Sequence, residues 1–272
     1  MRPHSIVLVL AFAGVAMCQA PDDLTGLPDG AGCAGRVIPQ GVDNGMIPRT
    51  NEQWLADCGV ESTKEALLSA LADPRPDVRS TAAQTLAQRR QNDALPAIAA
   101  AFSVERAPGT RMVMAYALAL LGDQPGLAEL RGMCKSVSAS AEFRLAAAHY
   151  LRDLKDDDWL DGFIAALQSV QTSPLSPEPR RDNALIAGLG GLATVLPLDK
   201  VSGRQRGEIR ALAEGCLSSG SRNLRVAASQ AVGRFGDAAS APKLEAAIAR
   251  EEDEKVRAQM EGDLEKLRTT QH

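Results

Sequence analysis

A short segment recurs six times along this chain, and each copy starts at an arginine that opens an alanine-rich stretch. The successive arginines lie 32, 33, 37, 44 and 32 residues apart. They are Arg79, Arg111, Arg144, Arg181, Arg225 and Arg257. A period of this length is typical of stacked two-helix units, none of which can bury its apolar face alone. The repeat therefore predicts an all-α fold, an α-solenoid of about six helical hairpins.

The composition favours helices over strands. Hydrophobic residues make up 45% of the chain, yet aromatic residues make up only 3%, and alanine and leucine dominate the apolar positions. Strands are enriched in β-branched and aromatic residues, whereas alanine and leucine are among the best helix formers. We therefore expect helices that pack closely through small side chains, and not a β-sandwich.

The helix–turn–helix pattern begins at residue 62. Ser62, with Glu65 three residues later, predicts a capped helix start. Positions three, four and seven after each of the first three arginines are small or apolar, which predicts the buried stripe of each second helix. Gly122 and Gly236 are expected to end second helices in a left-handed conformation. We place the repeat domain at residues 62–268.

Two stretches interrupt the period, at residues 172–179 and 196–203. Insertions of this kind map to one edge of a solenoid and often carry binding residues. The alternative is a surface loop that the fold simply tolerates. Both interpretations stay open for both stretches.

Residues 1–20 have the features of an export signal. Arg2 and His4 precede an apolar run from Ile6 to Met17, after which the chain becomes polar. The run is shorter than the roughly 20 apolar residues of a transmembrane helix. We therefore predict a signal peptide at residues 1–20 and an exported protein; a buried N-terminal helix is the alternative.

Two modes of signal cleavage remain open. The stretch before Cys18 resembles a bacterial lipoprotein box, in which Cys18 would carry the lipid, although Met17 stands where such boxes have a small residue. An ordinary cut after Ala20 would place Pro21 beside the scissile bond. Either mode predicts export, to the periplasm or medium in one case and to a membrane-anchored lipoprotein in the other.

Residues 21–61 are rich in glycine, proline and aspartate and predict a flexible segment that ends in a short cap at Gln53 to Cys58. Cys33 and Cys58 both lie in this segment and are the expected disulfide, since an exported protein meets an oxidising compartment. Cys134 and Cys216 belong to repeats separated by another unit, so we expect two buried free thiols.

Two stretches carry a resemblance to a known family. One contains Leu71-Ala72-Asp73-Pro74, Val78-Arg79, Ala82-Ala83 and Leu86; the other contains Leu224-Arg225-Val226-Ala227-Ala228, Ala231-Val232-Gly233 and Gly236-Asp237. Over residues 62–268 the pattern resembles the short HEAT repeat, a variety also found in the phycobilin (phycocyanobilin) lyase family. The copies at Arg181 and Arg257 depart from the pattern, because the small residues that follow the arginine are replaced there.

The resemblance implies a structural ladder. In repeats of this kind the recurrent arginine and nearby aspartates tie consecutive units together, so removing one would leave partly buried partners unpaired. The residues given this structural role are Asp77, Arg79, Arg111, Arg144, Arg225 and Arg257.

The sequence offers no pattern for catalysis. After the predicted signal the only histidines are His149 and His272, which cannot form a local metal cluster. The chain lacks the repeated His-Glu pairs of HEAT-repeat metal hydroxylases similar to deoxyhypusine hydroxylase, and it lacks a nucleophile elbow, a P-loop and a Rossmann fingerprint. Acidic turns at 156–158 and 251–254 read as helix starts, with calcium binding as the alternative. We expect no catalytic residue, metal or cofactor.

The net charge of −4 and the absence of a long basic run argue against nucleic-acid binding. In HEAT-like stacks the second helices line the concave side, so positions one, five and nine after the arginine should look into the groove. In the second and third repeats these positions predict an exposed apolar and aromatic patch made of Met112, Tyr116, Leu120, Leu145 and His149. Burial of this patch by residues 21–60 or by curvature is the alternative.

The sequence therefore predicts a non-catalytic scaffold or assembly factor of the bacterial cell envelope that binds a protein partner on this face. One alternative is an enzyme or enzyme subunit related to the lyases, which would bind a small molecule in the groove. The other is a structural spacer without a dedicated site.

Overall fold

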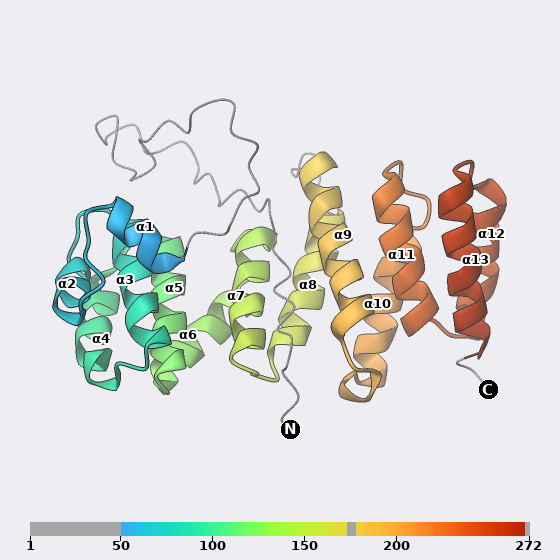
Figure 1. Cartoon of the computed structure of the whole chain (residues 1–272). Helices are drawn as coiled ribbons and strands as arrows, with labels where there is room; N and C mark the ends of the chain where they lie inside the picture. The colour runs from blue at the N-terminus through green and yellow to red at the C-terminus, as the bar shows by residue number, and fades with distance from the viewer. Residues whose placement is uncertain (1–49, 173–177, 270–272) are drawn as a thin grey trace, which may run out of the picture. The chain divides into compact units, whose positions relative to one another are not determined.

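The computed structural model describes residues 50–172 and 178–269, which belong to one compact unit. The predicted signal peptide, Cys18, Cys33 and His272 lie outside the described residues. Within those two ranges the chain forms thirteen α-helices and three short 3-10 helices, without a strand. The all-α class predicted from the sequence is confirmed (Figure 1).

The helices are α1 (Asn51–Asp57), α2 (Lys64–Ala70), α3 (Pro76–Gln88), α4 (Leu95–Val104), α5 (Pro108–Leu120), α6 (Gln124–Lys135), α7 (Ala141–Asp153), α8 (Trp159–Thr172), α9 (Glu178–Val195), α10 (Gly203–Cys216), α11 (Arg222–Phe235), α12 (Ala241–Arg250) and α13 (Glu254–Thr269). From α2 onward they form six successive hairpins, and most second helices pack on a neighbouring second helix, as α3 does on α5 and α11 on both α9 and α13. The predicted solenoid of about six helical hairpins is confirmed. The short helix α1 packs on α3 ahead of the first hairpin.

The alanine-rich stripes form the core, as predicted. The small and apolar residues at positions three, four and seven after the first three arginines are each 1% exposed or less. They are Ala82, Ala83, Leu86, Met114, Ala115, Leu118, Ala147, Ala148 and Leu151. Because consecutive units meet along these stripes, small side chains let the helix backbones approach closely.

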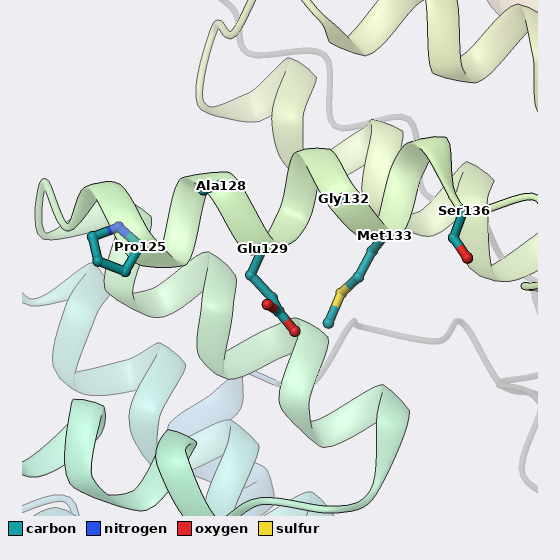
Figure 2. Close-up of a pocket in the computed structure, with 6 residues that line it drawn as sticks. All are labelled: Pro125, Ala128, Glu129, Gly132, Met133 and Ser136. Carbon is teal, nitrogen blue, oxygen red and sulfur yellow. The ribbon is translucent and has the colours of Figure 1, made fainter.

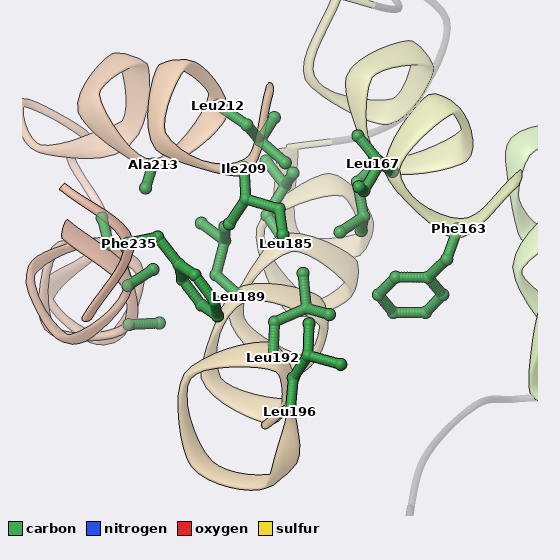
Figure 3. Close-up of a cluster of buried hydrophobic side chains, with 14 of the residues drawn as sticks. Phe163, Leu167, Leu185, Leu189, Leu192, Leu196, Ile209, Leu212, Ala213 and Phe235 are labelled. Carbon is green, nitrogen blue, oxygen red and sulfur yellow. The ribbon is translucent and has the colours of Figure 1, made fainter. Parts of the chain in front are cut away.

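Larger side chains fill the core that α8, α9, α10 and α11 form together (Figure 3). Leucine, isoleucine and phenylalanine side chains from all four helices meet there, none more than 5% exposed. They include Phe163, Leu167, Leu185, Leu189, Leu192, Leu196, Ile209, Leu212 and Phe235. The glycine-rich run at 188–191 lies inside α9, so it is part of a packed helix and not a phosphate-binding loop.

The start of α2 lies one residue later than predicted. Thr63, not Ser62, is the N-cap, and its side chain accepts a hydrogen bond from the backbone N–H of Ala66. Ser62 instead presents its carbonyl oxygen to Arg89. The spacing between Ser62 and Glu65 suggested a capping box, but threonine caps helices nearly as well as serine.

The two glycines predicted to end second helices in a left-handed conformation differ. Gly122 after α5 has a φ of 90°, as predicted. Gly236 after α11 has a φ of −68°, so the prediction is wrong there. A β-carbon at Gly236 would lie 2.5 Å from the carbonyl oxygen of Val232. Glycine is needed at this position because of close packing, which a sequence pattern does not distinguish from a turn.

The first helices α8 and α10 run side by side in the same direction. Arg204 near the start of α10 pairs with Asp161 near the start of α8, at 2.8 Å. At the other ends of the same helices, Gln171 donates a hydrogen bond to the carbonyl oxygen of Leu212, at 3.1 Å. The starts of α8 and α10 therefore lie side by side, and so do their ends, as in a regular stack.

Helix α6 meets α8 in a different way from the pair α8 and α10. Cys134, in its last turn, lies against Gly162, in the first turn of α8, so closely that a β-carbon at Gly162 would lie 2.0 Å from the Cys134 sulfur. Arg131 of α6 also pairs with Asp156 ahead of α8, at 2.5 Å. The end of α6 thus meets the start of α8, and Figure 1 shows α6 running across the direction of its neighbours.

The cysteines of the repeats are as expected. Cys134 and Cys216 are buried free thiols, and burial raises the pKa of Cys134 to about 11. Cys58 is disulfide-bonded, but its predicted partner Cys33 lies outside the described residues, so that pairing stays a prediction. None of the described helices combines the length and apolar character needed to cross a membrane.

Candidate partner-binding surface around α7

The five residues predicted to form an exposed patch do not all reach the surface. Met112 and Tyr116 on α5 are buried, each 6% exposed. Leu120, Leu145 and His149 are half-buried, and both leucines pack against the main core. The exposed patch expected from the sequence is therefore corrected to these last three residues, and their role in partner binding stays a prediction.

Tyr116 is buried because α7 covers it. Its ring stacks on that of Tyr150 with a centroid distance of 4.4 Å, and its hydroxyl donates a hydrogen bond to Asp153. Burial and the neighbouring Asp153 carboxylate raise the pKa of the Tyr116 phenol. The repeat pattern predicts an open groove position for Tyr116, and this is wrong because helical spacing within α5 carries no information about the side chains of the next hairpin.

On its other side α7 makes aromatic contacts with α8. His149 meets Phe163 edge-on, with ring centroids 5.5 Å apart, and Trp159 meets the same ring at 5.8 Å. The Arg152 guanidinium lies 5.8 Å from the Trp159 ring centroid. We call Tyr116, His149, Tyr150, Trp159 and Phe163 the α7 aromatic cluster. Sequence reasoning missed Tyr150 and Trp159 because neither occupies a groove-facing position of the repeat.

One face of α7 is left uncovered by the described helices. Six residues at spacings of three or four are exposed or half-buried, whereas the opposite positions are buried. We call this set the α7 surface: Glu142, Leu145, Ala146, His149, Arg152 and Asp153. It places two apolar residues and an imidazole between acidic and basic side chains, a mixture suited to protein recognition.

The imidazole of this surface is neutral at physiological pH. Desolvation, together with the charge of Arg152, lowers the pKa of His149 from 6.5 to about 4. Burial also raises the pKa of the neighbouring Tyr150 phenol. Around pH 7 these aromatic side chains are uncharged, so they offer apolar and hydrogen-bonding contacts and no acid–base pair poised for proton transfer.

The recurrent arginines tie successive hairpins together, but through glutamates. Arg79 binds the Glu105 carboxylate at 2.7 Å, and Arg225 binds Glu251 through two nitrogens at 2.6 and 2.9 Å. Each glutamate directly follows the first helix of the next hairpin. Each arginine also donates to two carbonyl oxygens of the turn that precedes it.

Other members of the predicted ladder vary. Arg111 pairs with Glu129 at 2.8 Å and lies 4.1 Å from the Phe102 ring centroid, and Arg257 donates to the carbonyl oxygen of Glu251. Asp77 is exposed, and its carboxylate forms no ion pair with the residues described, so the nearby aspartate is not the ladder partner expected. The carboxylates come from the following hairpin, 18 or 26 residues later, which local spacing did not reveal.

The acidic turns bind basic side chains. Asp158 pairs with Lys135 at 2.7 Å, and Asp253 pairs with Arg222 at 2.6 Å. Among the residues described, no group of histidine, cysteine and carboxylate side chains could hold a metal ion. These ion pairs agree with the interpretation of both turns as helix starts. The described ranges offer no set of ligands for the calcium alternative.

A shallow hollow of about 420 Å³ runs along one face of α6 (Figure 2). It is lined by Pro125, Ala128, Glu129, Gly132, Met133 and Ser136. The first five belong to α6 and Ser136 directly follows its end, and the six residues recur at spacings of three or four or lie side by side. Its single carboxylate, Glu129, is held by Arg111, so the hollow presents one neutralised charge on a face of small side chains.

Residues 53–119 of this chain match the family model for HEAT repeats. The match spans α1 to α5, including the first two hairpins, and agrees with the hairpin architecture of the whole described region. It supports a HEAT-repeat protein, a class that generally mediates protein–protein interaction. The match does not show the phycocyanobilin lyase subclass. No curated protein matches the chain.

Proposed function

We propose that this chain is a non-catalytic scaffold or assembly factor of a bacterial cell envelope, and that it binds a protein partner through the α7 surface. The observation that carries the proposal is the concentration of aromatic side chains at α7. The chain contains two tyrosines and two tryptophans, and both tyrosines and one tryptophan belong to the α7 aromatic cluster. Tyrosine, tryptophan and arginine carry much of the binding energy at protein interfaces.

The cluster gives the α7 surface a rigid base. Tyr116 and Phe163 are buried beneath it, and Tyr150 and Trp159 stand at its two sides. A partner would therefore meet Leu145 and His149 without having to order them first, which limits the entropic cost of association. The flanking charges of Glu142, Arg152 and Asp153 can fix its orientation.

The cell-envelope location rests on the predicted signal at residues 1–20. Residues 21–49 would then link the repeats to a lipid at Cys18 or to a free N-terminus. Export would also place the repeats outside the pigment-containing compartment in which phycobilin lyases work. A scaffold held at the envelope needs a binding surface and no catalytic group, and the α7 surface supplies such a surface.

The test is capture of the partner from the native envelope fraction by the full mature chain. Leu145→Glu combined with His149→Glu should abolish capture, because two carboxylates would face the apolar part of a partner. The matched control is Ala258→Glu with Gly262→Glu, which changes the corresponding positions of the last repeat. Arg152→Glu, at an exposed position, gives a third variant that leaves the core intact.

The outcomes separate the candidate functions. Loss of a stoichiometric partner in the α7 variants alone, with unchanged circular dichroism and unfolding midpoint, supports the scaffold. Equal capture by folded α7 variants and control variants contradicts the α7 surface. A bait that carries an added small-molecule mass and no protein partner would favour the lyase-related alternative. Substitutions in the groove that leave the cell without a phenotype would favour the structural spacer.

A further inference from the structure

Arg144 differs from the other arginines of the ladder. It is the fourth residue of α7, as Arg79 is of α3 and Arg225 is of α11. It is the most deeply buried of these three residues, at 7% exposed. Its Nε is fully buried and has no hydrogen-bond partner, and the described residues give its side chain no ion pair. The equivalent guanidinium groups in α3 and α11 each hold a glutamate carboxylate and two turn carbonyls.

The missing partner can be traced in the sequence. Glu105 directly follows α4 and Glu251 directly follows α12, the first helices of the hairpins after Arg79 and Arg225. The corresponding first helix for Arg144 is α8, which ends at Thr172. The next five residues of the chain are serine, proline, leucine, serine and proline, so the sequence places no carboxylate there.

A guanidinium stays charged at every physiological pH, so Arg144 cannot lose its charge to fit its surroundings. A buried charge without a counter-ion destabilises a fold, because the water that it gave up is not replaced. Nε is buried without a partner, whereas neither terminal nitrogen is among the fully buried unpaired atoms, so an anion would bind at the terminal nitrogens. The folded protein would therefore gain stability from an anion at this position.

We propose that Arg144 is a binding position for a carboxylate that comes from outside the described residues. The planar fork of a guanidinium matches a carboxylate, and the same fork binds carboxylates at Arg79 and Arg225. The position is distinct from the α7 surface, because Arg144 lies on the opposite, buried side of the helix. It does not depend on the function proposed for that surface.

The first test is thermal unfolding of the full mature chain in about 0.1 M sodium acetate, compared with sodium chloride at the same ionic strength. Acetate should raise the Tm of the native sequence by about 2–4 °C over chloride. Arg144→Met, which keeps the length of the side chain and removes the charge, should lose this response. Variants of the α7 surface should keep it, so failure of this proposal and failure of the scaffold are distinguishable.

The sign of the substitution effect is a second test that requires no ligand. In chloride, Arg144→Met should leave the Tm unchanged or raise it, because it removes an unpaired buried charge. Arg225→Met is the matched control and should lower the Tm by several degrees, because Glu251 would lose its partner. Equal loss of Tm in the two variants, or an acetate response that persists in Arg144→Met, would overturn the proposal.

A direct readout is the Nε–H resonance of Arg144 in a ¹H–¹⁵N spectrum, assigned by its absence in Arg144→Met. Acetate should shift this resonance saturably, and sodium chloride should not. N-acetylglutamate amide then identifies the source: tighter binding than acetate indicates a carboxylate on a peptide chain, and weaker binding indicates a free small acid. A resonance that does not move with either carboxylate would contradict the site.

Discussion

At the scale of single residues, the ladder shows what fixes one hairpin to the next. Glu251 accepts two bonds from the Arg225 guanidinium, and its own carbonyl oxygen accepts from Arg257, so one residue joins the last two hairpins. The Glu251 side chain is 3% exposed, and that of Arg225 is 20% exposed. Such a pair is costly to break because one charge would stay behind without its partner.

Replacing Arg225 by methionine should therefore destabilise the protein. We expect the free energy of unfolding to fall by about 3 kcal/mol, as when a buried ion pair loses one partner. Chemical denaturation gives this quantity. In the double variant Arg225→Met with Glu251→Leu, no charge is left unpaired, so most of the loss should be recovered. A double variant no more stable than Arg225→Met would show that the carboxylate is not the reason.

The His149 imidazole makes the stability of the protein depend on pH. Its folded-state pKa, about 4, lies below the unfolded value of 6.5, so the unfolded chain binds a proton first as the pH falls. The contribution of neutral His149 is thus fully present above pH 6.5 and is lost between pH 6.5 and 4. Some solvent contact reduces the effect, and we expect about 1–2 kcal/mol.

The variant His149→Phe keeps a ring against Phe163 but cannot titrate. Denaturation at pH 7 and at pH 4 should show a smaller loss of stability in the variant than in the native sequence. Parallel pH profiles for the two proteins would mean that His149 is solvated and has an ordinary pKa.

At the scale of elements, the sequence predicts where a helix forms better than it predicts how that helix is oriented. Arginine spacing and alanine stripes locate the hairpins because both follow from helical periodicity within one element. The orientation of α6 across its neighbours does not follow from this periodicity. It depends on the close contact between Cys134 and Gly162, which belong to different hairpins. Small side chains are common in this chain, so no pattern marks which of them allows two helices to approach most closely.

The α6–α8 contact predicts the effect of a single methyl group. The β-carbon of Gly162→Ala would overlap the Cys134 sulfur, so the variant should lose about 1–3 kcal/mol of stability. Cys134→Ala in the same chain removes the obstacle and should restore part of the loss. Gly132→Ala on α6, where a β-carbon meets nothing within 4 Å, is the control and should be neutral or stabilising. Denaturation midpoints equal for Gly162→Ala and Gly132→Ala would contradict this packing.

At the scale of the whole molecule, the fold class follows from the repeat, but the binding surface does not. Leu145 and His149 are half-buried positions of α7, the second helix of the third hairpin, and their role in binding stays a prediction. Met112 and Tyr116 occupy the equivalent positions of the second repeat but are buried, because α7 brings Tyr150 and Asp153 over α5. A repeat pattern treats all units as equal, whereas a binding surface arises where units differ. The aromatic cluster at α7 and the crossing of α6 are such differences.

The most direct test of the α7 surface is site-specific photo-crosslinking in the intact cell envelope. A photoreactive amino acid is placed at Ala146 on α7 and, in a separate protein, at Ala258 on α13. We expect irradiation to join one protein partner to the chain at residue 146 and to give no such product at residue 258. The same products from both positions, or none from residue 146 in a correctly folded protein, would contradict the proposed binding surface.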